Sequence, residues 1–254
     1  SNPFFVQEVF RHLAEEGKLF DKNGAFRPGL RGDQLQVPEG VRLVLGRRLA
    51  RLSENARRIL TTAALIGRVF SLELLEELER AQPDAALEAV EEAECAHLVE
   101  TERHGRQTRF RFVHELVRQT LSGTLSAPRR QRLHARVAQV MEEVYASTID
   151  AHASALAHHL FQAGSSADPE KAIHFLSEAA RQASKAAAHE EALDHLHKAV
   201  SLLDNERTAR AALLHARRAG ELRSLSRNRD AVLEYERALA LCDVLGDHVQ
   251  FVET

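Results

Sequence analysis

One histidine, His114, occupies the position in this chain that is best suited to chemistry. It follows the alternating segment of residues 109–112 and lies at the start of a helical segment that begins near Val113, so it is predicted at the point where a strand turns into a helix. A ring at such a junction can point at a bound phosphate. The same position also suits a polar residue that caps the following helix. The residues alone leave both interpretations of His114 open.

The loop that would hold a nucleotide's phosphates does not occur in this sequence. The signature GxxxxGK followed by Ser or Thr is absent, because Gly17-Lys18 precedes Leu19 and neither Gly46 nor Gly67 precedes a lysine. That loop supplies backbone amides and a lysine for the phosphates, and a hydroxyl for magnesium. This chain alone is therefore predicted to bind no nucleotide cofactor and to hydrolyse no ATP.

The remaining histidines and serines form no recognised catalytic or metal-binding pattern. The chain has 14 histidines, but none belongs to an HExxH motif, and adjacent His158 and His159 diverge on a helix. His189 and His195 are six residues apart and face nearly opposite sides of a helix. No GxSxG nucleophile elbow is present either. Neither a metal site nor a hydrolase is predicted.

The charge pattern argues against direct DNA binding. The helix predicted at residues 84–96 is acidic and carries no Lys or Arg, whereas a helix in the major groove needs cations and donors. Its carboxylates are Asp84, Glu88, Glu91, Glu92 and Glu94. Arginines gather later, at Arg103, Arg106, Arg109, Arg111, Arg118, Arg129, Arg130, Arg132 and Arg136. We interpret them as a solvated face, part of which could meet an acidic partner or a nucleotide domain.

Composition predicts a mainly α protein of the reducing cytoplasm. The 254 residues are 44% hydrophobic and only 5% aromatic, with no tryptophan, which is typical of helices packed on helices. A formal net charge of −3 gives no overall attraction to polyanions. Cys95 and Cys242 form no CxxC pair, and no run of 18 uncharged apolar residues occurs. No membrane partner is therefore expected.

The pattern along the chain predicts three domains. Residues 1–50 contain an amphipathic helix and a small hairpin around Asn23-Gly24. Residues 51–125 predict a winged helix. Its first helix is expected to begin after the capping residue Ser53 and to end at Gly67. The next two helices are predicted at residues 71–80 and 84–96. A β-hairpin and a closing helix follow them.

Residues 126–254 predict a helical array. The helical pattern is interrupted near Ser147 and at residues 164–166, 204–205 and 227–228. A pair of alanines seven residues apart recurs at an offset of 39 residues, as Ala192 and Ala199, then Ala231 and Ala238. These small residues resemble the second helix of a tetratricopeptide unit, whose length is about 34 residues. A TPR-like α-solenoid with a concave face for a protein or peptide is expected.

Two segments together resemble the STAND class of regulatory ATPases. Val113-His114-Glu115-Leu116 is similar to the Met-His-Asp motif of that class, and it follows the winged-helix hairpin as in the family. Asn2-Pro3-Phe4-Phe5 resembles the GNPFF segment of bacterial members, with Ser1 in place of the glycine. The resemblance extends over essentially the whole chain, from the end of an ATPase lid through the winged helix into the repeats.

The resemblance implies a nucleotide switch whose motor lies outside this chain. Residues 1–50 would be the remnant of a helical lid, and an upstream P-loop domain would carry ADP or ATP. His114 would contact the terminal phosphate of ADP and Pro3 would pack near the adenine, with Asn2 beside it as a further candidate. The effector domain would belong to another part of the full-length protein. It could be an enzyme, such as a nucleotide cyclase or a kinase, or a LuxR-type DNA-binding domain.

Two other functions remain open from the sequence. The chain could be a stand-alone TPR-like scaffold for protein interactions, in which the winged helix is only a packing module. It could also be a DNA-binding regulator that acts through the winged helix, although the acidic residues 84–96 argue against that function.

Overall fold

The computed structural model of the protein describes residues 45–104, 107–203 and 208–245, and the chain divides into two compact units between Leu125 and Ser126. Each unit is considered by itself. Asn2, Pro3 and the Asn23-Gly24 hairpin lie outside the described residues, as does the break at residues 204–205.

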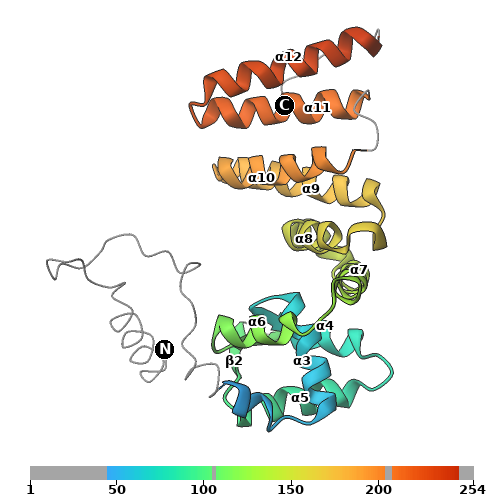
Figure 1. Cartoon of the computed structure of the whole chain (residues 1–254), viewed down its shortest axis with the longest axis vertical. Helices are drawn as coiled ribbons and strands as arrows, with labels where there is room; N and C mark the ends of the chain where they lie inside the picture. The colour runs from blue at the N-terminus through green and yellow to red at the C-terminus, as the bar shows by residue number, and fades with distance from the viewer. Residues whose placement is uncertain (1–44, 105–106, 204–207, 246–254) are drawn as a thin grey trace, which may run out of the picture. The chain divides into compact units, whose positions relative to one another are not determined.

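The first unit combines short helices with one small antiparallel sheet (Figure 1). Residues 45–49 are helical. The elements that follow are α3 (Glu54–Ile66), β1 (Val69–Ser71), α4 (Leu72–Leu78), α5 (Pro83–Cys95), β2 (Val99–His104), β3 (Gln107–Phe112) and α6 (Glu115–Gly123). Three helices before a hairpin, and one after it, is the order predicted from the sequence for a winged helix.

Local signals in the sequence explain where α3 begins and ends. The Ser53 hydroxyl accepts a hydrogen bond from the Ala56 amide at 3.1 Å, which confirms the predicted N-cap. The Gly67 amide closes the last turn by donating to the Ala63 carbonyl. Ser53 also joins α3 to α5, because its hydroxyl donates to Glu92 Oε1 at 2.9 Å and its amide to Glu92 Oε2 at 2.9 Å.

The sheet contains a strand that the sequence analysis did not predict. The order is β1-β3-β2, so the hairpin strand β3 pairs with β2 on one side and with β1 on the other. The register opposes Phe70 to Phe110 and Val99 to Phe112. The helix expected at residues 71–80 is correspondingly shorter, because residues 69–71 pair as a strand and α4 ends at Leu78.

The core of the first unit lies between this sheet and the helices. The rings of Phe70 and Phe112 have centroids 5.3 Å apart, and both rings are buried. Ile59, Leu75 and Leu121 meet them from α3, α4 and α6, and each is at most 2% exposed. The alternation of β3 thus buries Phe110 and Phe112.

We expect Ser53→Ala to lower the unfolding free energy of the first unit by about 1 kcal/mol, because the variant loses the N-cap bond and both hydroxyl contacts of Ser53. Urea denaturation followed by circular dichroism measures this loss. Ser53→Thr keeps a capping hydroxyl and should retain most of the stability. If Ser53→Ala unfolds at the wild-type urea concentration, the cap contributes nothing.

The second unit consists of helices that pack in chain order. They are α7 (Ala127–Val144), the 3-10 helix η2 (Ala146–His152), α8 (Ala153–Ala163), the 3-10 helix η3 (Gly164–Ser166), α9 (Pro169–Lys185), α10 (His189–Ser201), α11 (Ala209–Ser224) and α12 (Asn228–Leu245). The short connections after α9 and α11 make each following helix antiparallel to its predecessor. Figure 1 shows α9 beside α10 and α11 beside α12.

The two hairpins α9–α10 and α11–α12 share the predicted 39-residue spacing. Their connecting turns contain Ala187 and Ser226, which both have positive φ, at 57° and 60°. The next amide in each turn bonds back to the helix, from Ala188 to Ala183 and from Arg227 to Leu222, at 2.8 Å each. The alanine pairs of α10 and α12 are all at most 3% exposed, so small residues at these positions let the helices approach closely.

Candidate functional site

His114 lies on the short link between β3 and α6. Phe112, the last residue of β3, is fully buried, and its amide donates to the Arg68 carbonyl at 3.0 Å. The next amide, of Val113, donates to the Leu98 carbonyl at 3.0 Å. On the other side, Val117 anchors α6 in the core. The link is therefore held at both ends, and the position of His114 is defined by the sheet and by the helix.

The His114 ring caps α6. His114 is the N-cap residue, with extended φ and ψ of −140° and 139°, and its Nδ1 accepts a hydrogen bond from the Leu116 amide at 3.1 Å. An imidazole nitrogen that accepts a hydrogen bond carries no proton, so the neutral ring carries its proton on Nε2. His114 thus has the capping role that the sequence left open, and the proton of the neutral ring lies on Nε2.

The surroundings of His114 favour this neutral form. The ring is half-buried, and burial lowers its pKa, with a further lowering by the charge of Arg68 and an opposing effect from Glu115. Because the pKa lies below the ordinary histidine value, the ring is uncharged at neutral pH. A neutral imidazole therefore lies within reach of the charge of Arg68.

Arg68 is the cation that accompanies this imidazole. Its charge acts on the pKa of both His114 and Glu115, and its side chain is exposed. Within the described ranges it forms no ion pair. Sequence reasoning did not select Arg68, because the neighbouring strand β1 was not predicted. A neutral N–H donor next to an arginine is a suitable pair of groups for an anionic oxygen.

Arg118 and Glu115 neutralise each other on the first turns of α6. Arg118 Nε donates to both carboxylate oxygens of Glu115, at 2.9 and 3.0 Å, and its Nη1 donates to the Ala64 carbonyl at 3.1 Å. The Arg118 hydrogen bond is the main cause of the lowered pKa of Glu115. Arg118 therefore attaches α6 to α3.

The predicted nucleotide residues can be compared with the structure only at His114. Pro3 and Asn2 lie outside the described residues.

The predicted recognition helix α5 presents carboxylates to solvent. Asp84, Glu88 and Glu91 are exposed on α5, and Glu92 is engaged by Ser53. A surface of this sign repels a phosphate backbone.

His134, His159 and His189 in the second unit contact side chains of neighbouring helices. His134 on α7 and His159 on α8 are buried, and their Nδ1 atoms are 2.9 Å apart, whereas the neighbouring His158 is exposed. His189 Nδ1 lies 2.8 Å from Glu221 Oε2. In the described part of the chain, no group of three or more His, Cys, Asp or Glu side chains is arranged to hold a metal ion.

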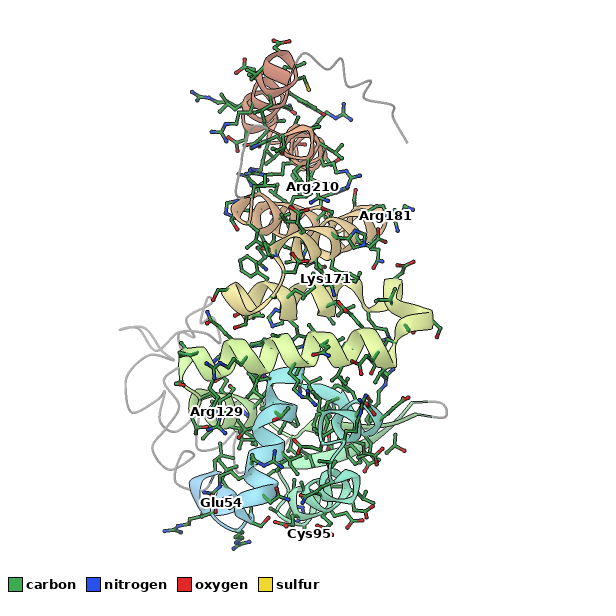
Figure 2. All side chains as sticks on the ribbon, turned by 90° about the vertical axis from the view of Figure 1, so that its right-hand side faces the viewer. Glu54, Cys95, Arg129, Lys171, Arg181 and Arg210 are labelled. Carbon is green, nitrogen blue, oxygen red and sulfur yellow. The ribbon has the colours of Figure 1, made fainter. Side chains whose placement is uncertain are left out.

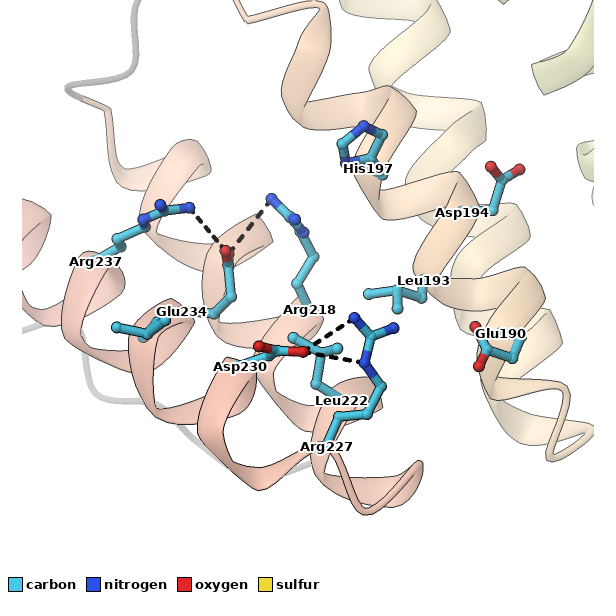
Figure 3. Close-up of a pocket in the computed structure, with 11 residues that line it drawn as sticks. Glu190, Leu193, Asp194, His197, Arg218, Leu222, Arg227, Asp230, Glu234 and Arg237 are labelled. Atoms are coloured by element: carbon cyan, nitrogen blue, oxygen red, sulfur yellow. Dashed lines mark hydrogen bonds and ion pairs between the residues drawn. The ribbon is translucent and has the colours of Figure 1, made fainter.

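A groove of about 440 Å³ opens between α10, α11 and α12. Figure 3 shows Arg218 and Arg237 pointing toward Glu234, while Arg227 turns to Asp230. Glu234 is only 5% exposed. Its carboxylate oxygens lie 2.7 Å from His215 Nδ1, 3.4 Å from an Arg218 nitrogen and 2.9 Å from an Arg237 nitrogen. The arginines of this groove are therefore already matched by carboxylates, and the cluster joins α11 to α12.

Comparison with protein-family models, with curated proteins and with solved structures found no match for this chain. The similarity to the STAND class therefore rests on the quoted sequence segments alone. The helices in the described ranges include none that is long and apolar enough to cross a membrane.

Proposed function

We propose that this chain is the regulatory and partner-sensing part of a STAND-type ATPase that acts in signal transduction or transcription regulation. In this proposal the first unit contributes His114 to ADP held by an upstream P-loop domain, with Pro3 and Asn2 at the adenine side. The helical second unit binds a protein or peptide partner. The setting is the cytoplasm, with which the free thiols of Cys95 and Cys242 are compatible.

The observation that carries the proposal is the state of the His114 ring. Its Nδ1 is engaged by the Leu116 amide, so the proton is on Nε2, and Arg68 lies nearby. Such a donor can bond a terminal phosphate oxygen without having to gain a proton first. Bound ADP would stabilise the closed form and a partner the open form, so the two ligands compete through one conformational equilibrium.

The alternative function is a TPR-like interaction scaffold without nucleotide control. The cap bond from the Leu116 amide favours it, because this bond alone gives His114 a structural role. The scaffold needs His114 only as the cap of α6, whereas the nucleotide switch also needs its contact with ADP. A variant that keeps the cap and removes the imidazole therefore distinguishes the two functions.

The test joins the chain to its natural upstream domain and compares His114→Leu with His114→Asn. Asparagine is a good N-cap residue, so His114→Asn should keep the stability of the first unit but lose the Nε2–H donor. We expect both variants to bind ADP about tenfold more weakly in calorimetry, and to raise the basal output of the full-length protein. Glu88→Gln, on the exposed side of α5, should change neither property.

Unchanged ADP affinity and unchanged basal output in both His114 variants would exclude the sensor role. An upstream region without a phosphate-binding loop would exclude the ATPase proposal altogether and leave the scaffold. Reduced ADP affinity in His114→Leu alone would assign the effect to the helix cap.

A further inference from the structure

A second groove, of about 400 Å³, lies between α7, α8 and the start of α9. Its floor includes Leu160, which is buried, and Ala135. Arg132, Arg136 and Gln139 line it from α7, and Lys171, labelled in Figure 2, lines it from α9. Glu142 and Asp168 also line the groove, so its rim carries three basic and two acidic side chains above an apolar floor. Lys171 pairs with Glu142, which leaves Arg132 and Arg136 as the cations that face solvent.

Arg132 and Arg136 are exposed and form no ion pair among the residues that the structure describes. Arg129, also exposed and labelled in Figure 2, is three residues before Arg132, a spacing that places both on one side of a helix. By contrast, Arg227 and Arg237 in the groove of α10 to α12 are matched by Asp230 and Glu234.

The local structure makes this arrangement unfavourable in isolation. Arg132 and Arg136 are four residues apart on a helix, where like charges destabilise by about 0.2–0.5 kcal/mol. The first turn of α7 has no acidic residue, and its N-cap Ser126 makes no side-chain capping bond. Arg129 thus adds positive charge to the positive end of the helix dipole. An acidic ligand would offset the repulsion between the arginines and the unfavourable charge at this end of the helix.

A buried acceptor lies at the far end of the groove. Glu142 Oε2 accepts from Lys171 Nζ at 2.9 Å, whereas Glu142 Oε1 is buried without a hydrogen-bond partner. Because this oxygen is buried, the groups that remain accessible to a ligand in the groove are the charges of Arg132 and Arg136. Moreover, the residues that line the groove include no aromatic side chain on which a nucleic-acid base could stack.

We infer that the groove formed by Arg132, Arg136 and Leu160 is a docking site for an acidic peptide segment of a protein partner. The inference rests on the part of the proposed function in which the second unit binds a partner. It adds the chemistry of that partner. Acidic side chains pair with Arg132 and Arg136, which are about 6 Å apart along the axis of α7. That separation is close to the spacing of about 6.6 Å between alternate side chains of an extended peptide. An apolar side chain between the two acids then lies over Leu160.

The test uses the whole chain without nucleotide and a fluorescein-labelled synthetic peptide in which glutamates alternate with leucines. Fluorescence anisotropy measures its binding. The double variant Arg132→Gln/Arg136→Gln should bind about tenfold more weakly, because two exposed charge pairs are lost. Arg217→Gln/Arg223→Gln removes the same charge from exposed positions of α11 and should bind like wild type.

Two further probes test the chemistry. A peptide with serine in place of leucine should bind more weakly, and the charge-reversed Arg132→Glu/Arg136→Glu chain should prefer a lysine-leucine peptide. Equal losses in the α7 and α11 double variants would overturn the proposal, since they would show attraction by net charge alone. Tighter binding of a labelled oligothymidine than of the acidic peptide would overturn it in favour of nucleic acid. The assay contains no nucleotide, so its failure leaves the His114 result unaffected.

Discussion

Replacing Glu234 by glutamine is expected to lower the unfolding free energy of the second unit by about 3 kcal/mol. The Glu234 carboxylate lies between α11 and α12 and contacts His215, Arg218 and Arg237. Arg218 is itself only 16% exposed, and its Nε is buried without an acceptor. When the Glu234 charge is removed, this guanidinium loses its counter-ion in a place where water does not replace it.

A matched substitution on the same helix distinguishes the loss of a buried carboxylate from the loss of an exposed one. Asp230→Asn also removes one carboxylate of α12, but its ion pair with Arg227 is half exposed on both sides. Such a pair contributes at most about 1 kcal/mol, so Asp230→Asn should unfold close to wild type. Urea denaturation followed by circular dichroism measures both variants. Equal small losses would show that the Glu234 cluster is as weak as a surface pair.

The elements with strong local signals were predictable from the sequence. The cap at Ser53, the alternation of residues 109–112 and the recurring alanine pairs all depend on near neighbours in the chain, and each appears in the structure as helix start, strand or buried contact. Strand β1 was missed because three residues are too few to show a period of two. It is a strand because it pairs with β3, about forty positions later.

The groups around the candidate sites were less predictable because tertiary contacts create them. Arg68 is placed beside His114 by β1, the strand that the sequence did not reveal. Glu234 follows the pattern of an ordinary surface residue of α12, and only the facing side chains of α11 make it a buried centre of charge. His134 and His159 are 25 residues apart, and the packing of α7 on α8 brings their rings together.

This histidine pair gives the second unit an expected sensitivity to acid. Burial lowers the pKa of His134 from 6.5 to about 4, with further lowering by His158 and then Arg130. The unfolded chain therefore binds a proton near pH 6.5, whereas the folded chain resists protonation until about pH 4. Stability is complete above pH 6.5 and falls as the pH drops through this window, by about 3 kcal/mol in total.

Urea denaturation at a series of pH values measures this effect. The double variant His134→Leu/His159→Leu replaces both partners by apolar side chains and should flatten the slope between pH 6.5 and 4. His197→Gln changes an exposed histidine of α10 and should leave it unchanged. The hydrogen bond from Arg181 is the main cause that lowers the pKa of Glu178 to about 2. The contribution of Glu178 to stability is therefore lost only between pH 4.5 and 2. If the unfolding free energy changes with pH between 6.5 and 4 as steeply in the double variant as in wild type, the acid sensitivity belongs to other groups.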